Sequence, residues 1–395
     1  MAPPVLAYLA PCGMGLGHAG RMLSVARRLR QAGVDVVFSS YGRAADMIER
    51  SGYRCLRTRP VGYEVDEQGD IDVRRTIAKG PLNLYRFARQ VGDELYYIGT
   101  LEPDVVVSDS RLSSLLAAKA LGVPAVLVIH QLRVIIPVKK PTRVKLSAKY
   151  LAEEGLLRLL GKLWLLADEI LIPDYPPPYT VARANAMVET LLPRARFVGP
   201  SPPVWPDELP PREEVRERLG VEGKLVVASF TGVSGEGREL CEAFLAELGG
   251  CDLSDEVVVI VSRGVPSGSD RLEKVGRNVY VCDWLPDRYL HVKAADALVT
   301  HGGHTMVMEA MAFGIPAVHV VRRTHTERLA CSLSAEALGV AKTHIVGEGD
   351  LCSALRWALS DEAWAAAQDL ASRLSQYRGD RAIAEAALKR AGAAL

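Results

Sequence analysis

The chain has 395 residues, of which 49% are hydrophobic and 24% are charged, and its formal net charge is +1. This length exceeds one ordinary hydrophobic core and predicts two domains. The near-neutral charge argues against a dedicated nucleic-acid binder, which would show a strong basic excess.

The cysteines are scattered along the chain and contain no CxxC pair. We therefore expect reduced thiols in a cytoplasmic protein, and neither a disulfide framework nor a zinc site. They are Cys12, Cys55, Cys241, Cys251, Cys282, Cys331 and Cys352. No uncharged stretch reaches the roughly 18–20 residues of a membrane span, which predicts a soluble or peripheral protein. The apolar N-terminal run has no basic leader, so it does not read as a signal peptide.

Strand-like and helix-like segments alternate along the first half of the chain. Residues 5–12 read as a strand, 21–33 as a helix that ends in glycine, and 34–40 as the next strand. Further strand-like runs follow at 105–110, 125–131 and 169–173. Strands that alternate with helices predict a parallel sheet covered on both faces.

The same pattern then restarts after a proline-dense segment at 198–215. Residues 224–249 repeat the order of apolar strand, Gly/Ser-rich turn and helix, which predicts a second Rossmann-like domain. The expected division is 1–203, 204–375 and a C-terminal helix at 376–395 that packs back on the first domain. One large sheet with an insertion is the alternative.

A glycine-rich loop follows the first strand-like run: Gly13, Gly15 and Gly17 lead into His18. Ligands of open parallel sheets bind at the carboxyl ends of strands, where this loop lies. A dinucleotide site would need GxGxxG and an acid at the end of the next strand. Here the spacing is GxGxGH and Asp35 begins that strand, so the pattern argues against NAD.

A second glycine turn ends the strand-like run near residue 300. It reads His301–Gly302–Gly303, and the following helix should begin near His304 or Thr305. The free N–H groups at the start of that helix would point at a diphosphate. Glu309 lies one helical turn beyond Thr305, where it can accept hydrogen bonds from ribose hydroxyls.

Three segments carry a family resemblance: WLPDRYLH (284–291), THGGHTMVMEAMAFGIPAV (300–318) and HTER (325–328). They resemble the nucleotide-sugar signature of inverting GT-B glycosyltransferases. This group includes UDP-glucuronosyl/glucosyltransferases, lipid II-forming N-acetylglucosaminyltransferases and galactolipid synthases. GMGLGHAGR (13–21) resembles the acceptor-side loop of the same group. The resemblance implies an α/β GT-B fold, with UDP-sugar mainly on the C-terminal domain and acceptor on the N-terminal one.

The resemblance also implies the donor site. Trp284 and Leu285 match the base-pocket element, and Glu327 with Arg328 falls where the family has Asp/Glu followed by Gln at the donor sugar. Arg328 departs from that Gln and leaves the sugar open. The expected donor residues are Gly232, Ser234, Gly235, Arg263, Trp284, Leu285, His301, Gly302, Gly303, His304, Thr305, Glu309, Glu327 and Arg328.

His18 is the expected catalytic base, because an imidazole of ordinary pKa near ~6.5 suits proton abstraction around neutrality. Asp109 ends a strand at the same sheet edge and would orient His18. The alternative role for His18 is binding of an acceptor phosphate. The expected acceptor contacts are Gly15, Gly17, His130 and Gln131. No DxD element stands in a metal-binding context, so we expect no metal and no cofactor. Helix N-termini, His301 and Arg263 would then stabilise the leaving group.

The segment 132–150 mixes apolar and basic residues and has no acid, which is typical of contact with anionic lipid headgroups. An ordinary basic loop is the alternative. The prediction is an inverting, metal-independent transfer of a hexose or N-acetylhexosamine, with GlcNAc or Glc favoured, from a UDP-sugar to a hydroxyl. A membrane lipid or lipid-linked glycan is the expected acceptor class, at the inner face of the cell membrane. A UDP-sugar epimerase and a non-catalytic nucleotide-sugar-binding subunit are the alternatives.

Overall fold

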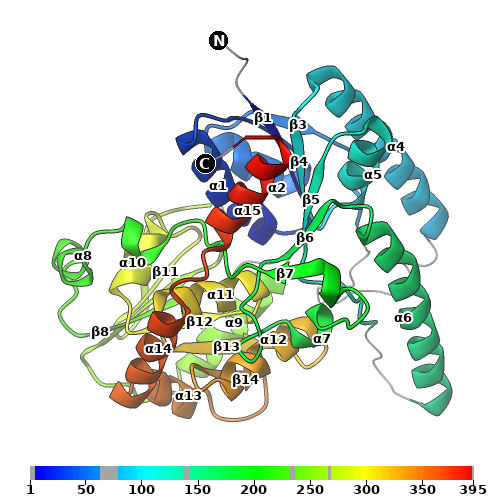
Figure 1. Cartoon of the computed structure of the whole chain (residues 1–395). Helices are drawn as coiled ribbons and strands as arrows, with labels where there is room; N and C mark the ends of the chain where they lie inside the picture. Colours follow the sequence, from blue (N-terminus) through cyan, green and yellow to red (C-terminus); the bar gives the residue numbers. More distant parts are fainter. Residues whose placement is uncertain (1–4, 63–78, 137–141, 231–235, 266–267, 394–395) are drawn as a thin grey trace.

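The computed structural model describes residues 5–62, 79–136, 142–230, 236–265 and 268–393 (Figure 1). It has two α/β domains, each a sheet flanked by helices, and both chain ends lie at the N-terminal domain. The predicted class of two Rossmann-like domains is therefore confirmed, and the alternative of one large sheet is wrong. Within the described ranges, none of the helices is long and apolar enough to cross a membrane.

The N-terminal sheet is parallel throughout, with the strand order β3-β2-β1-β4-β5-β6-β7. From β1 the chain adds strands toward one edge of the sheet, up to β3, and from β4 it adds them toward the other edge. At this switch point the loops that leave β1 and β4 diverge and open a crevice. Its strands are β1 (Leu6–Pro11), β2 (Asp35–Ser40), β3 (Cys55–Arg57), β4 (Val105–Asp109), β5 (Ala125–Val128), β6 (Glu169–Ile172) and β7 (Ala195–Phe197). Its helices are α1 (Leu16–Gln31), α2 (Gly42–Arg50), α4 (Gly80–Leu101), α5 (Leu112–Leu121), α6 (Arg143–Trp164), α7 (Arg183–Ala186) and the 3₁₀ turn η1 (Leu192–Arg194).

The C-terminal sheet has the order β10-β11-β9-β8-β12-β13-β14, and only the β10–β11 pair is antiparallel among the described strands. Its switch point lies between β8 and β12, so the turn after β12 opens onto a crevice of its own. The strands are β8 (Lys224–Ser229), β9 (Val257–Ser262), β10 (Glu273–Gly276), β11 (Val279–Cys282), β12 (Ala297–Thr300), β13 (Ala317–Val321) and β14 (Ala341–Ile345). The helices are η2 (Pro206–Glu208), α8 (Arg212–Leu219), α9 (Glu236–Leu248), α10 (Arg288–Ala294), α11 (His304–Phe313), α12 (Thr326–Ala337), α13 (Leu351–Ala358) and α14 (Asp361–Leu374). The last helix, α15 (Gly379–Arg390), belongs to the N-terminal domain by its packing.

Helix α1 begins at Leu16, five residues earlier than the sequence pattern indicates. Gly15 makes this possible, because its φ of 97° lies in a region that favours glycine and turns the chain sharply out of β1. As a result His18 lies in the first turn of a helix rather than in a loop. The helix then buries an apolar face that includes Met22 and Ala26 against the sheet.

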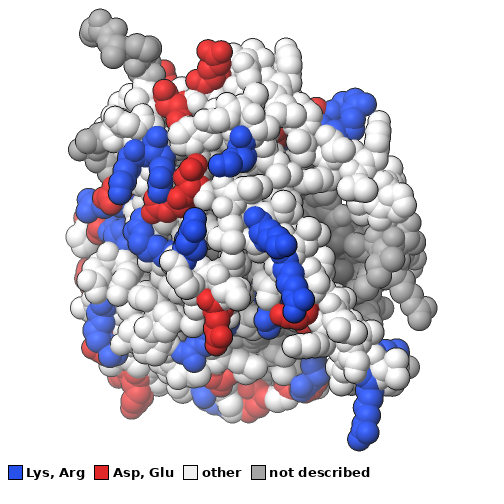
Figure 2. Space-filling model, turned by 45° about the vertical axis from the view of Figure 1, so that its right-hand side comes forward, with Lys and Arg blue, Asp and Glu red and all other residues white. Residues whose placement is uncertain are grey.

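The chain crosses between the domains near Val198–Trp205 and returns near Tyr377–Gly379, and α15 packs against α1, β4 and β5 of the N-terminal domain. The two crossings touch: the Gly379 amide donates to the Pro200 carbonyl at 2.8 Å. A Cβ on Gly379 would lie 2.3 Å from the Gly199 carbonyl oxygen, so this contact requires glycine. Over the face drawn in Figure 2, basic and acidic side chains are interspersed, which agrees with the near-zero net charge.

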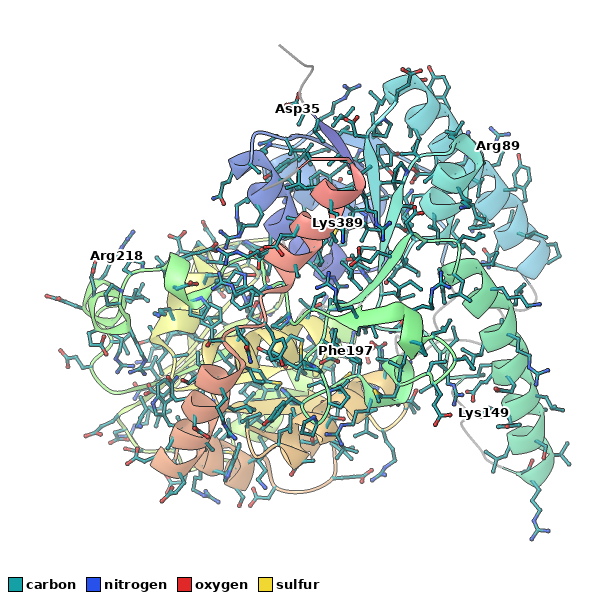
Figure 3. The ribbon with its side chains drawn as sticks, in the orientation of Figure 1. Asp35, Arg89, Lys149, Phe197, Arg218 and Lys389 are labelled. Atoms are coloured by element: carbon teal, nitrogen blue, oxygen red, sulfur yellow. A yellow bond between two sulfur atoms is a disulfide. The ribbon has the colours of Figure 1, made fainter. Side chains whose placement is uncertain are left out.

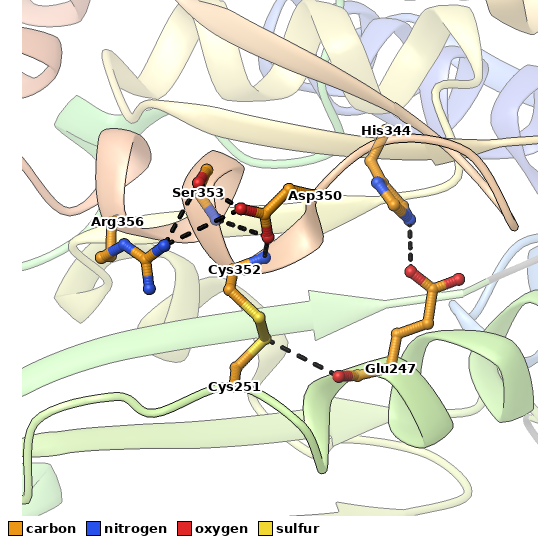
Figure 4. Close-up of a disulfide and its surroundings, with 7 residues drawn as sticks. All are labelled: Glu247, Cys251, His344, Asp350, Cys352, Ser353 and Arg356. Carbon is orange, nitrogen blue, oxygen red and sulfur yellow. Dashed lines mark hydrogen bonds and ion pairs between the residues drawn. A yellow bond between two sulfur atoms is a disulfide. The ribbon is translucent and has the colours of Figure 1, made fainter.

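A disulfide joins Cys251, just beyond α9, to Cys352 in the first turn of α13 (Figure 4). The expectation of reduced thiols is therefore wrong for this pair, whereas the other cysteines are free. The two residues are 101 positions apart in sequence, but their Cα atoms lie 5.2 Å apart. Only the packing of α9 and α13 on one face of the C-terminal sheet brings them together, so their spacing in the sequence contained no sign of the bond.

Opening this disulfide should destabilise the C-terminal domain, because the bond closes a long loop and restricts the unfolded chain. Cys352→Ser should lower the free energy of unfolding by about 2–4 kcal/mol. Urea unfolding followed by circular dichroism measures this, with and without a reductant. Cys55→Ser, at a free cysteine in the N-terminal domain, is the matched control. An unfolding midpoint of the wild type that does not move on reduction would contradict the bond.

Candidate functional site

The N-terminal switch point holds a hydrogen-bonded trio. His18 Nδ1 lies 2.9 Å from Asp109 Oδ1, and Arg21 Nε donates to Asp109 Oδ2 at 2.9 Å. His18 and Arg21 share one face of α1, because they are three residues apart. Asp109 is the last residue of β4, and its carbonyl accepts the amide of Cys12 directly after β1. The neighbouring ends of β1 and β4 therefore bring His18 and Asp109 together.

The carboxylate of Asp109 has no solvent exposure, whereas the His18 side chain is 18% exposed. Burial alone would raise the pKa of Asp109, but the charges and hydrogen bonds of Arg21 and His18 hold it well below its usual range. Asp109 is therefore ionised and can accept a hydrogen bond from His18 Nδ1–H. In that tautomer, His18 Nε2 is left with a lone pair that can take a proton.

The C-terminal switch point presents the expected glycine turn. Gly302 has a φ of 69°, and a Cβ there would lie 2.4 Å from Ser332 Oγ, so the turn requires glycine. Gly303 is the N-cap of α11, and His304 is its first residue. The helix therefore begins where the sequence predicts, with its unpaired N–H groups at the end of β12.

His301 stands beneath this turn, with its Nε2 only 2.8 Å from where a Cβ of Gly303 would be. Burial, helped by the charge of Arg328, holds the pKa of His301 well below its ordinary value. The imidazole is therefore neutral around pH 7. It offers a hydrogen bond at the turn rather than the positive charge expected for a leaving diphosphate.

Glu309 lies in α11 and is only 2% exposed. Arg288, the first residue of α10, binds it bidentately, with contacts of 3.0 Å from Nη1 and 2.5 Å from Nη2. This pairing compensates the buried carboxylate and holds it in one orientation. The ion pair uses part of the acceptor capacity of Glu309 and leaves further lone pairs for hydroxyl donors.

The two switch points face each other across the domain interface. A Cβ on Gly17 would lie 2.7 Å from Thr305 Oγ1, so the first turn of α1 touches the first turn of α11. A small pocket beside this contact is lined by both domains: Arg21, Pro173, Pro200, Ser201, Pro202, His304, Thr305 and Met308. The two glycine-containing segments thus meet at the domain interface.

Two His–carboxylate contacts also cross the interface, in opposite directions. His130 after β5 places Nε2 3.4 Å from Glu327 Oε1 in α12, and His304 Nε2 lies 3.2 Å from Asp174 Oδ2 after β6. The rings of His130 and His304 stack at 4.2 Å and 7°. His130, expected among the acceptor residues, therefore contacts donor-side groups.

The remaining expected donor residues that the structure describes belong to the C-terminal domain. Arg263 pairs with Asp283 at 3.2 Å, Leu285 is buried, and Trp284 is half-buried beside it. Gly232, Ser234 and Gly235 lie outside the described residues, so the second glycine loop stays a prediction. Asp35 lies at the start of β2, on the side of the N-terminal domain away from the C-terminal domain (Figure 3), which agrees with the argument against NAD.

Sequence reasoning missed three partners: Arg21, Arg288 and Asp174. Arg21 could have been found from its spacing, because it lies one helical turn after His18. Asp174 follows the predicted strand at 169–173, so its position at the carboxyl edge of the sheet could also have been predicted. No sequence pattern indicated the pairing of Arg288 with Glu309, because it depends on how α10 packs beside α11.

The comparisons with known proteins agree with this geometry. Residues 231–342 match the glycosyltransferase family 28 C-terminal domain. A glycosyltransferase of Methanopyrus kandleri is 30% identical over 315 residues, which cover 78% of this chain and 82% of that protein. One from Methanosarcina mazei is 27% identical over 413 residues, with 96% of this chain and 97% of that protein covered.

Solved structures show the same fold at low sequence identity. The glycosyltransferase of kitacinnamycin superposes with a TM-score of 0.67 at 17% identity, covering 98% of this chain and 99% of the other. MurG of Acinetobacter baumannii gives a TM-score of 0.60 at 14% identity, with coverages of 98% and 100%. The two-domain fold is thus shared with these structures. The chain belongs to the glycosyltransferases of the GT-B fold with a family 28 C-terminal domain, and this protein is a glycosyltransferase.

Proposed function

We propose that the enzyme transfers a hexose or N-acetylhexosamine from a UDP-sugar to an acceptor hydroxyl with inversion, and without a metal ion. The observation that carries this proposal is the contact between Gly17 and Thr305, which joins the first turn of α1, where His18 lies, to the N terminus of α11. The proposed base and the helix end proposed to bind the diphosphate therefore lie on opposite sides of one interface, as direct displacement at a sugar carbon requires.

In the proposed reaction His18 Nε2 takes the proton of the acceptor hydroxyl as its oxygen attacks C1 of the sugar. The C1–O bond to the diphosphate breaks, and its electron pair leaves with UDP. Attack from the face opposite UDP inverts the configuration at C1. Asp109 accepts from Nδ1–H and stabilises the imidazolium that forms, while Arg21 keeps Asp109 in place.

The leaving diphosphate gains charge as the C1–O bond breaks. The N–H groups at the start of α11 and the positive end of its dipole are directed at this position, and they need no reorganisation during the reaction. Glu309, held by Arg288, is the proposed acceptor for ribose hydroxyls. A nucleoside diphosphate is also the ligand in a solved neighbour, SsfS6 with thymidine diphosphate, which has a TM-score of 0.58.

Glu309→Gln should weaken binding of UDP by about 10-fold or more, because a charge-assisted hydrogen bond to ribose is lost. Isothermal titration calorimetry measures it, and a thermal melt reports whether the uncompensated Arg288 also destabilises the fold. Glu362→Gln, at an exposed position of α14, is the matched control. Unchanged affinity in the Glu309 variant, or a wild type that does not bind UDP, would refute the proposed donor site.

His18→Ala and Asp109→Asn should each lower kcat by about 100- to 10,000-fold with little change in UDP affinity.

The lowered pKa of Asp109 means that its stabilising contribution is present above its unfolded-state pKa and is lost only when the pH falls through its lower folded value. Asp109 therefore stays ionised between pH 5 and 8. Protonation of Asp109 should accordingly cause no loss of kcat/KM between pH 8 and 5, which a pH–rate profile measures.

The assay is UDP release from UDP-N-acetylglucosamine or UDP-glucose with lipid extracts as the acceptor source. Full turnover by His18→Ala would exclude it as the base and leave acceptor binding as its role. Production of an epimer from UDP-sugar without any acceptor would instead identify the alternative epimerase reaction.

We further propose that the acceptor is presented at an anionic lipid surface and that α6 contacts it. Most of α6 is exposed, including Val144, Tyr150, Leu151 and Leu159, and only three of its residues are buried. In the first part of α6 the exposed Val144 and Leu146 lie among Arg143, Lys145 and Lys149. Lys149, labelled on this helix in Figure 3, also pairs with Glu153 at 2.5 Å. Apolar side chains between cations favour headgroup contact. Lys139 and Lys140, in the same predicted segment, lie outside the described residues.

Val144→Ser combined with Leu151→Ser should reduce co-sedimentation with phosphatidylglycerol vesicles by at least about 5-fold, because apolar area that would enter the lipid is lost. Val275→Ser, at an exposed valine of β10 in the other domain, is the matched control. Binding of the wild type should also weaken with salt. Identical pellets for the wild type and the double variant would remove α6 from the proposal.

A further inference from the structure

His130 is the residue whose place in the structure differs most from what the sequence suggested. It follows β5 in the N-terminal domain, yet its Nε2 faces Glu327 Oε1 of the C-terminal domain at 3.4 Å. The His130 side chain is 7% exposed and that of Glu327 is 30% exposed. The histidine is thus embedded in the interface, whereas part of the Glu327 side chain reaches the surface.

A rigid set of contacts holds the His130 ring in this place. It stacks on His304 at a centroid distance of 4.2 Å, and His304 Nε2 lies 3.2 Å from Asp174 Oδ2. Asp174 is itself fixed, because its carboxylate accepts the backbone amides of Tyr175, Val181 and Ala182. The anchored carboxylate, the two stacked rings and Glu327 form one chain of contacts across the domain interface.

The protonation states of Glu327 and His130 determine which hydrogen bonds Glu327 can form. Burial would raise the pKa of Glu327, but hydrogen bonds from His130 and Gln131 hold it well below its usual range. Burial and the neighbouring His304 lower the pKa of His130 to about 4, so this ring is neutral near pH 7 and donates from Nε2–H. Glu327 is therefore an ionised carboxylate that only accepts, and two donors leave part of its four lone-pair positions unused.

Glu327 lies in the first turn of α12, and a glutamate in solution samples many rotamers. Fixing such a side chain before a ligand arrives removes an entropic cost from binding. The His130 ring also lies 6.3 Å from the His18 ring. A sugar held by Glu327 would accordingly stand close to the proposed base.

We propose that His130 is a positioning residue for the donor sugar. It belongs to the N-terminal domain and holds Glu327 of the C-terminal domain in place. The unused acceptor positions of Glu327 then select a sugar with a free hydroxyl at that contact. This inference rests on the proposed function, because it assumes a nucleotide-sugar donor at α11. It also means that the sugar subsite is complete only when both domains are together, whereas the nucleotide subsite belongs to the C-terminal domain.

The test compares binding of UDP with binding of UDP-N-acetylglucosamine and UDP-glucose by calorimetry. His130→Phe keeps a flat ring that can stack on His304 but removes the donor to Glu327. It should leave the UDP dissociation constant within about twofold and weaken the UDP-sugars by about 10-fold, the scale of one charge-assisted hydrogen bond. Glu327→Gln should weaken the same ligands, and the double variant should be no worse than Glu327→Gln alone, because the two residues act as a unit.

Glu327→Gln, made at the other end of the contact, keeps the inference testable if His130→Phe fails to fold. The ratio of UDP-sugar to UDP affinity is the decisive quantity. A ratio unchanged by either variant would overturn the inference, and so would a His130→Phe variant that changes only the KM of the acceptor. Failure of the wild type to bind UDP refutes the proposed function itself, and this outcome is distinct because it precedes any comparison of sugars.

Discussion

The buried carboxylate of Asp109 is the constraint on which the arrangement of His18 and Arg21 in the N-terminal domain depends. An ionised group without solvent exposure is costly unless opposite charge and hydrogen bonds compensate it. Arg21 supplies the charge, and its position on α1 requires the helix to begin early enough for His18 and Arg21 to share a face. Gly15 allows that early start. Backbone geometry, electrostatic compensation and the orientation of His18 are thus one arrangement.

The C-terminal domain also contains a buried carboxylate that an arginine compensates. Glu309 is buried and compensated by Arg288, and glycines bring the turn after β12 close to its neighbours. In both domains the functional groups stand where the strand order reverses, since only there do adjacent loops diverge. The contact between α1 and α11 then joins the two crevices into one site.

Fixing one domain on the other requires contacts away from this site as well. The chain crosses between the sheets twice, and α15 buries apolar residues such as Ile383 and Leu388 against the N-terminal domain. The crossed pairs His130–Glu327 and His304–Asp174 add polar contacts at the interface itself. Under the proposed function, this arrangement would let one domain bind the nucleotide while the sugar requires both.

The sequence by itself determined the fold class, the two glycine turns, the start of α11 and the type of enzyme. The fold class and the turns follow from local signals, namely strand and helix periods and glycine spacing. The type of enzyme follows from the resemblance of short motifs to those of GT-B glycosyltransferases. Only the tertiary structure decided the partners of the site residues, including Arg288 for Glu309, Asp174 for His304, the turn of His130 toward Glu327, and the Cys251–Cys352 bond. Each of these contacts joins residues 21 to 197 positions apart. Such contacts arise from how helices and domains pack, which no local pattern encodes.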